Sequence, residues 1–344
     1  PLVDATLPQD RGAWAATLAK LVGSVVIDPG LASTPDALHQ QLMQAIDAHR
    51  AGRHDHARMA YDAILREQPA HALTLHLRGA LLREMGDADA AAADFATALA
   101  IAPRDAKSRV GAAQLALTAH RAAEARSLIE AGLALHPADA SMQRTLGHAA
   151  LAQRDGATAI NAFAAALGAE PFDAETHFNH GVALQMMRYL GDAARAYQRA
   201  LDLEPSLADA HFNLGIAFDQ LGEADSAVAA LEYVLKRQPD RASAHRTLLD
   251  ILSRNDRGAE WMRAFARFEQ RCPDALGLVA NALEYYQYMG DFAKVHRYAE
   301  RLSRDEFTPA NEIDLVDSLE QLLYLMLFFD FEPGTQSSLY ATYD

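Results

Sequence analysis

The sequence has 344 residues, of which 50% are hydrophobic and 8% aromatic, so it can form a large folded core. Its 31 Lys and Arg residues against 46 Asp and Glu residues give a net charge of −15, which argues against nucleic acid or an anionic membrane as a partner. One cysteine excludes an internal disulfide framework, and the longest apolar run, residues 322–329, is far shorter than the roughly 20 residues that span a bilayer. We therefore expect a globular, cytoplasmic protein.

The chain begins with a segment, residues 1–37, that lacks the regular spacing of residues 38–308. The stretch "DRGAWAATLAKLVGSVV", about residues 10–26, is expected to form a capping helix, and a linker joins it to the periodic part.

From residue 35 onward, prolines recur with a period of 34 residues. They are Pro35, Pro69, Pro103, Pro137, Pro171, Pro205, Pro239 and Pro273. A small residue usually follows each proline by ten positions, an alanine by 22, and a bulky apolar residue by 26. This spacing is similar to the tetratricopeptide repeat, in which each unit is a pair of antiparallel helices, A and B. The small residue and the alanine let the two helices approach closely, the bulky residue fills the space between pairs, and proline ends helix B.

The pattern predicts about eight such repeats over residues 38–308, of which the last two are degenerate. Leu249 and Leu283 replace the small residue there, and Trp261 replaces the alanine. Terminal repeats are often atypical because they cap the stack. The expected fold is an all-α, right-handed superhelix with helical caps.

The last segment, residues 309–344, departs from the repeat and is expected to begin with a helix from about 309 to 329. From residue 305 to the end there are nine acidic residues and no Lys or Arg. One interpretation is a solvated acidic cap. The other is a surface that docks onto a following domain through the apolar residues Leu322, Leu325, Phe328 and Phe329.

In helix A of the middle repeats, a polar residue lies two positions before the small residue. At steps of 34 this position holds Thr145, Asn179, Asn213, Thr247 and Asn281. Helical spacing rotates the position away from the core and places Asn213 on one face with Gln220. We expect this row to lie in or along a groove, where it would bind the backbone of an extended peptide. The alternative is that these are ordinary half-exposed repeat residues.

The segments "THFNHGVAL" at 176–184 and "AHFNLGIAF" at 210–218 resemble the repeats of bacterial O-linked N-acetylglucosamine transferases and SPINDLY-type proteins. Residues 322–344 also resemble that family's passage from repeats to catalytic domain. The resemblance implies that groove asparagines hold an acceptor polypeptide, and that a nucleotide sugar would bind a following domain. Only Asn179, Asn213 and Asn281 match the family's ladder.

No catalytic, cofactor-binding or metal-binding residues are predicted within residues 1–344. His177, His211 and His245 recur at 34-residue steps, but helices 8–10 Å apart hold such side chains too far apart for one ion, so a packing role is expected. The first hypothesis is recognition of acceptor polypeptides for a bacterial protein O-glycosyltransferase. The alternatives are a free-standing scaffold and the recognition region of another enzyme, such as a sulfotransferase. Homodimerisation through repeat surfaces is a further option.

Overall fold

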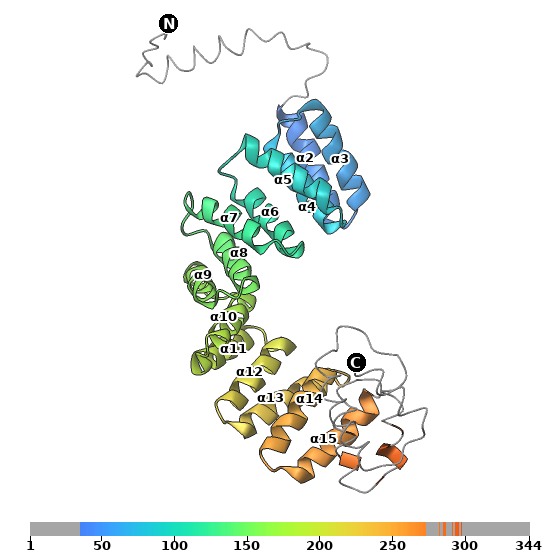
Figure 1. Ribbon diagram of the computed structural model, residues 1–344. Coiled ribbons are helices and arrows are strands. Elements are labelled where there is room, and N and C mark those ends of the chain that lie inside the picture. The colour runs from blue at the N-terminus through green and yellow to red at the C-terminus, as the bar shows by residue number, and fades with distance from the viewer. Residues whose placement is uncertain are drawn as a thin grey trace, which may run out of the picture. The chain divides into compact units, whose positions relative to one another are not determined.

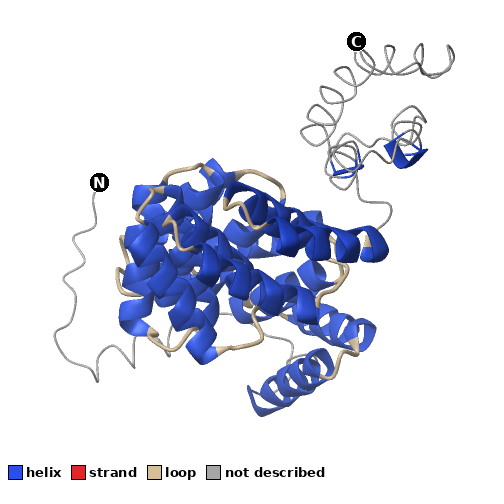
Figure 2. Cartoon of the chain, turned by 90° about the horizontal axis from the view of Figure 1, so that it is seen from below, coloured by secondary structure: helices blue, strands red, loops and turns tan. Residues whose placement is uncertain are grey.

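The structure is a computed structural model that describes residues 35–272 and a few later positions, which are Ala282, Tyr285, Tyr286, Asp291, Ala293–Val295 and Arg297. In this described part the regular elements are all α-helices joined by loops (Figure 2). The prediction of an all-α chain is therefore confirmed. Several predicted features lie outside the described residues, namely the capping helix at about 10–26, Asn281, Leu322, Leu325, Phe328 and Phe329.

The helices belong to two compact units, which divide within one helix after Ala149. In each unit short turns join the helices into consecutive A and B pairs, labelled in chain order in Figure 1. The first unit contains α2 (Pro35–Arg50), α3 (His54–Glu67), α4 (Ala72–Glu84), α5 (Ala88–Ile101), α6 (Ala106–Thr118), α7 (Ala122–Leu133) and most of α8 (Ala140–Ala152). The second contains α9 (Gly156–Ala169), α10 (Ala174–Met186), α11 (Leu190–Leu203), α12 (Ala208–Gln220), α13 (Ala224–Arg237), α14 (Ala242–Arg254) and α15 (Gly258–Arg271).

Helix boundaries follow from local chemistry at both ends. Several helices begin after an aspartate whose carboxylate accepts a backbone N–H of the first turn, as Asp105 does for α6 and Asp173 for α10. The turn between helices A and B needs one residue in the left-handed region. Glycine supplies it in three repeats, for example Gly222 with φ +82°, whereas Arg154 and Arg188 adopt φ values of 58° and 63°.

The buried core repeats with the same period as the sequence. The bulky position of helix B is at most 1% exposed in seven successive repeats, and its members are Tyr61, Phe95, Ile129, Phe163, Tyr197, Leu231 and Phe265. A Cβ atom added to Gly79 would lie 3.0 Å from the Phe95 ring and 3.3 Å from the Ala91 carbonyl oxygen. The predicted roles of the small residue, the alanine and the bulky residue in close helix packing are therefore confirmed.

The first repeat presents a polar face where later repeats present a buried one. Gln40 and Asp47 are exposed, whereas their equivalents one repeat later, Thr74 and Leu81, are both 0% exposed. Exposed polar side chains at positions that are buried in the following repeat are typical of a terminal repeat.

The degenerate seventh repeat compensates for its larger residues with an aromatic cluster. Trp261 stacks on Phe265 with ring centroids 5.1 Å apart and lies 5.3 Å from the ring of Tyr285. Leu249 is fully buried in the same core cluster. Trp261 therefore packs toward the next segment of the chain instead of letting its own two helices approach closely.

Candidate protein-binding surface

The A helices of successive repeats touch one another directly within each unit. In the second unit α10 contacts α12 and α12 contacts α14, in addition to the contacts that each makes with its neighbours in sequence. We call the face formed by α10, α12 and α14 the second A-helix surface. Because its helices are adjacent, a ligand that crosses them meets equivalent positions of consecutive repeats.

The predicted polar row runs along the boundary between each helix A and the preceding repeat. Its member in the third repeat is Gly111, where an added Cβ atom would lie 2.6 Å from Cζ of Phe95, the bulky residue of the repeat before. The row position therefore lies against the preceding core residue, which explains why a glycine interrupts the row and why Gly111 is buried.

Asn213 is held by a hydrogen-bond network around a buried tyrosine. The Tyr197 hydroxyl donates to Gln185 Oε1 at 2.8 Å and is also hydrogen-bonded by the Asn213 side chain. Gln185 in turn donates to Gln220 Oε1 at 3.2 Å. Burial raises the pKa of Tyr197, and the bond from Asn213 opposes that rise. Asn213 and Gln220 thus belong to a network that satisfies a buried hydroxyl. This network was not predicted from the sequence, although the repeat pattern aligns Tyr197 with Phe163 and so marks the position where the hydroxyl is added.

The other row residues use one polar atom within their own helix. Asn179 Nδ2 donates to the Glu175 carbonyl oxygen at 2.9 Å, and Thr247 Oγ1 donates to that of Ser243 at 2.9 Å. Both side chains are half-buried. Thr145 makes the same kind of bond but is only 3% exposed, so we do not include it in the proposed surface.

A prediction about folding stability separates Asn213 from Asn179. Asn213→Ala removes a partner of a buried hydroxyl and is expected to lower the free energy of unfolding by about 1 kcal/mol. Asn179→Ala removes only a bond on a half-exposed side chain and is expected to change it by less than about 0.5 kcal/mol. Urea unfolding of both variants, each repeated in a Tyr197→Phe background, measures the difference. If the Asn213→Ala cost persists without the Tyr197 hydroxyl, the network does not explain this residue.

The first unit has an equivalent network with ionisable members. The Tyr61 hydroxyl lies 3.4 Å from His49 Nδ1, and His49 Nε2 lies 3.1 Å from Glu84 Oε2 on the next helix A. Burial raises the pKa of Tyr61 to about 12. These three residues precede Tyr197, Gln185 and Gln220 by four repeat lengths, so the same three positions join adjacent A helices in both units.

The recurring histidines are hydrogen-bonded to the proline loops, a structural contact that the expected packing role did not include. The Nε2 atoms of His177, His211 and His245 lie 3.0, 3.3 and 2.8 Å from the carbonyl oxygens of the prolines six residues earlier. Because a carbonyl oxygen only accepts, Nε2 carries the proton. Gln143 donates to the Pro137 carbonyl oxygen in the same way at 3.0 Å. Within the described residues, no group of three or more His, Cys, Asp or Glu side chains is placed to hold a metal ion.

Four partly buried histidines lead to a prediction of how the folding stability depends on pH. Burial lowers the pKa of His76, His180, His211 and His245 below 6.5 in the folded state. Above that pH both states are neutral, whereas below it the unfolded chain binds protons first. The free energy of unfolding is therefore expected to fall as pH decreases from about 7.5 to 5.5.

The variant His245→Gln tests that prediction at one site. The Nδ1 atom of His245 is buried and has no hydrogen-bond partner among the described residues, so protonation there would bury a charged group. Glutamine can still donate a hydrogen bond to the Pro239 loop, as Gln143 does to the Pro137 loop. We therefore expect the free energy of unfolding of the variant at pH 7.5 to lie within about 1 kcal/mol of that of wild type. Its urea midpoint should fall less between pH 7.5 and 5.5 than that of wild type. An equal fall would assign the pH dependence to other groups.

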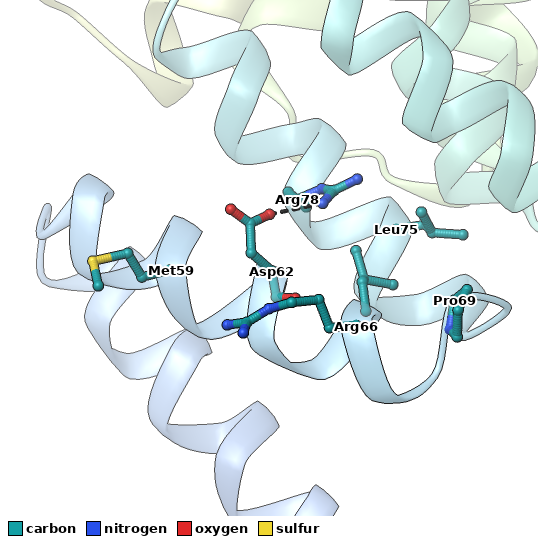
Figure 3. A pocket seen from close by; sticks show the side chains of 7 residues that line it. Met59, Asp62, Arg66, Pro69, Leu75 and Arg78 are labelled. Atoms are coloured by element: carbon teal, nitrogen blue, oxygen red, sulfur yellow. Dashed lines mark hydrogen bonds and ion pairs between the residues drawn. The ribbon is translucent and has the colours of Figure 1, made fainter.

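A shallow pocket of the first unit is lined by residues of α3, of α4 and of the loop between them (Figure 3). Arg78 at this pocket donates to Asp62 through Nη1 and to Asp94 through Nε and Nη2, each at 2.7 Å. The two bonds to Asp94, more than the one to Asp62, raise the pKa of Arg78. Since both aspartates already neutralise the guanidinium, we interpret this cluster as a structural ion-pair network.

The comparisons with known proteins address the fold. Tetratricopeptide repeat models match residues 82–149, 144–185 and 208–241, and a TPR repeat model matches residues 190–222. No curated protein matches the sequence. No helix among the described residues is long and apolar enough to cross a membrane.

Three solved structures illustrate the similarity. PilW, a widely conserved type IV pilus biogenesis factor, shares 19% identity with a TM-score of 0.55, over 60% of this chain and 96% of PilW. A tetratricopeptide repeat protein from Parabacteroides merdae shares 15% identity with a TM-score of 0.52, over 68% of this chain and 93% of that one. Pseudomonas aeruginosa pilF shares 16% identity with a TM-score of 0.51, over 64% and 97%. At these identities the likeness concerns the fold alone, and with the matched repeats it shows that the described part of this chain is a tetratricopeptide repeat solenoid.

Proposed function

We propose that this protein is a binding scaffold whose second A-helix surface holds an extended segment of a client protein. The observation that carries the proposal is the row of amide and hydroxyl side chains on adjacent A helices, repeated every 34 residues. Packed helices are about 8–10 Å apart and an extended chain advances about 3.3–3.6 Å per residue. A client crossing the surface would therefore meet one such side chain about every three residues.

The side chains of this surface present both a hydrogen-bond acceptor and hydrogen-bond donors to a client backbone. The Asn179 side chain uses one N–H of its amide within its own helix, which leaves the side-chain oxygen Oδ1 to accept a hydrogen bond from a client. Gln220 accepts from Gln185 through Oε1, which leaves its amide N–H groups to donate. An extended backbone presents both donors and acceptors. Such contacts contribute about 0.5–1.5 kcal/mol each and read no particular side chain, so they suit a surface that accepts many clients.

The finer proposal is that the clients are acceptor polypeptides of an attached or associated bacterial protein O-glycosyltransferase. It is supported by the resemblance of residues 176–184 and 210–218 to repeats of that family, with Asn179 and Asn213 at the matching position. Catalysis and the nucleotide sugar would then belong to another domain. A scaffold without attached chemistry, or one that serves another enzyme such as a sulfotransferase, uses the same surface.

Site-specific photo-cross-linking tests the scaffold proposal. A photo-reactive amino acid replaces Gln220 or Met186 on the A helices, or Met262 on helix α15 as a control; Met186 and Met262 are 40% and 44% exposed. After illumination in lysate of the source cells, mass spectrometry identifies the joined peptides. We expect the same client segments at both A-helix positions and none at the control, with several-fold less product after Asn179→Ala. Equal labelling at Met262 would contradict the proposal, and glycan on the captured segments would support the transferase role.

A further inference from the structure

The A-helix face of the first unit differs in charge from the second A-helix surface. We call the face formed by α2, α4 and α6 the first A-helix surface. It carries the cations Arg50, Arg83 and Lys107, in a chain whose net charge is −15. At the matching positions α10 and α12 carry Glu175, Asp209 and Asp219 and no Lys or Arg. Two of these acids are paired, Asp209 with Arg241 and Asp219 with Arg254 of α14, so the second A-helix surface lacks the unpaired cations of the first. Charge is therefore distributed unevenly along the row of A helices.

Direct contacts place the three helices of the first A-helix surface side by side. His49 bonds Glu84 between α2 and α4, and the Arg83 guanidinium bonds the Gln114 side chain between α4 and α6. The Ser108 hydroxyl lies 3.2 Å from His76 Nδ1, also between α4 and α6. The three helices that carry the cations are therefore adjacent in the fold.

The cations of this surface are not neutralised by carboxylates of the described residues. Glu84, the acidic residue of this surface on α4, is hydrogen-bonded to His49, and Arg50, Arg83 and Lys107 form no ion pair in the described part of the chain. Their positive potential is felt locally: burial lowers the pKa of His76, Asp105 opposes this, and Lys107 and Arg83 add to the lowering. Arg78 on the other side of α4 shows the contrast, because two aspartates hold it.

Two large apolar side chains lie on the same helices beside the cations. Met43 of α2 is 41% exposed and Leu73 of α4 is 50% exposed. Leu73 occupies the same repeat position as Lys107 one repeat later, so the apolar side chain and the cation are neighbours on adjacent A helices. A ligand with both carboxylates and apolar side chains would complement this surface.

We infer that the first A-helix surface binds an acidic, apolar-containing segment of the client protein. The inference rests on the proposed function and adds a chemical preference to it. Carboxylates of the client would pair with Arg50, Arg83 and Lys107, while its apolar side chains would cover Met43 and Leu73. Long-range attraction would speed encounter and would weaken as salt is added.

Fluorescence anisotropy with two synthetic peptides tests the inference on the full chain. The probes are fluorescein-labelled peptides of about 12 residues, one of repeated Glu-Leu-Ser and one of repeated Gln-Leu-Ser. The acidic peptide is expected to bind at least about tenfold more tightly than the neutral one at about 50 mM NaCl, and to lose most of that advantage at about 300 mM. The variant Arg50→Gln, Arg83→Gln, Lys107→Gln should abolish the preference.

A matched control separates the surface from the overall charge. The variant Arg58→Gln, Arg66→Gln, Lys236→Gln removes three exposed cations from B helices and should retain the preference; circular dichroism confirms that both variants fold. Equal affinity for the two peptides, an unaffected surface variant, or an equal loss in the control would each overturn the inference. Cross-linking at Gln220 and Met186 concerns the second unit, so the proposed function can stand when this inference fails. If that cross-linking also fails, both are overturned.

Discussion

Replacing Arg78 by methionine is expected to lower the free energy of unfolding by about 2–4 kcal/mol, more than any other single substitution that we propose. The guanidinium makes two bonds to Asp94, whose side chain is only 7% exposed. Without Arg78 this carboxylate stays buried without its cation, and methionine fills the space without restoring the charge balance. Urea unfolding followed by circular dichroism measures the loss, and amide hydrogen exchange should localise it to α3, α4 and α5.

Two further variants test that explanation. Asp62→Asn removes the exposed half of the network, since the Asp62 side chain is 41% exposed, and should cost less than about 1 kcal/mol. Arg78→Met combined with Asp94→Leu replaces the buried pair by apolar groups and should recover most of the lost stability. If the double variant is as unstable as Arg78→Met alone, the loss comes from packing and not from the unpaired carboxylate.

The fold could be predicted from the sequence because one period governs both local and tertiary structure. The proline lattice fixes where helix B ends, and the small residue, the alanine and the bulky residue fix how the two helices pack. The described A helices from α4 to α14 begin at residues 72, 106, 140, 174, 208 and 242, again 34 residues apart. Repeat contacts are local in sequence, so a pattern within one unit is sufficient to specify them.

The candidate site was less predictable because its residues have partners in the neighbouring repeat. A helical-wheel argument placed Asn213 away from the core of its own helix, but it contained no information on Tyr197, which belongs to the preceding repeat. Thr145 shares its position with Asn213, yet it is 3% exposed. Comparing each row residue with the bulky residue 16 positions earlier would have revealed the hydroxyl at Tyr197 and the steric limit at Gly111.

The Arg78 network was also not predicted from the sequence, because the network is visible only when Arg78 is considered together with its two acidic partners. Arg78 occupies a position that holds Leu146, Leu214 and Leu248 in other repeats, and taken alone it looks like a defect of the pattern. Its partners lie 16 residues before and 16 residues after it, on the two helices B that flank α4. A charge at an apolar position, with acids at both of those distances, is the sequence signal that would have indicated the network.

Gly181→Ala is expected to lower the free energy of unfolding by about 2–3 kcal/mol, although alanine favours a helix by about 1 kcal/mol over glycine. A Cβ atom at Gly181 would lie 2.6 Å from Cε1 of Tyr197, whose buried ring is also held by its hydroxyl bonds to Gln185 and Asn213. The ring therefore has little freedom to yield, and the two helices must separate.

Gly215→Ala is the matched control for this position one repeat later. There the added Cβ atom would lie 3.2 Å from Cγ of Leu231 and 3.3 Å from the Ala227 carbonyl oxygen, so a small shift relieves the contact. We expect the helix-propensity gain and the packing cost to cancel within about 1 kcal/mol. Tyr197→Leu in the Gly181→Ala background copies the sixth repeat and should recover part of the loss. Equal costs at Gly181 and Gly215 in urea unfolding would show that the residue opposite the glycine does not set the tolerance, contrary to the close-packing role that we assign to this position.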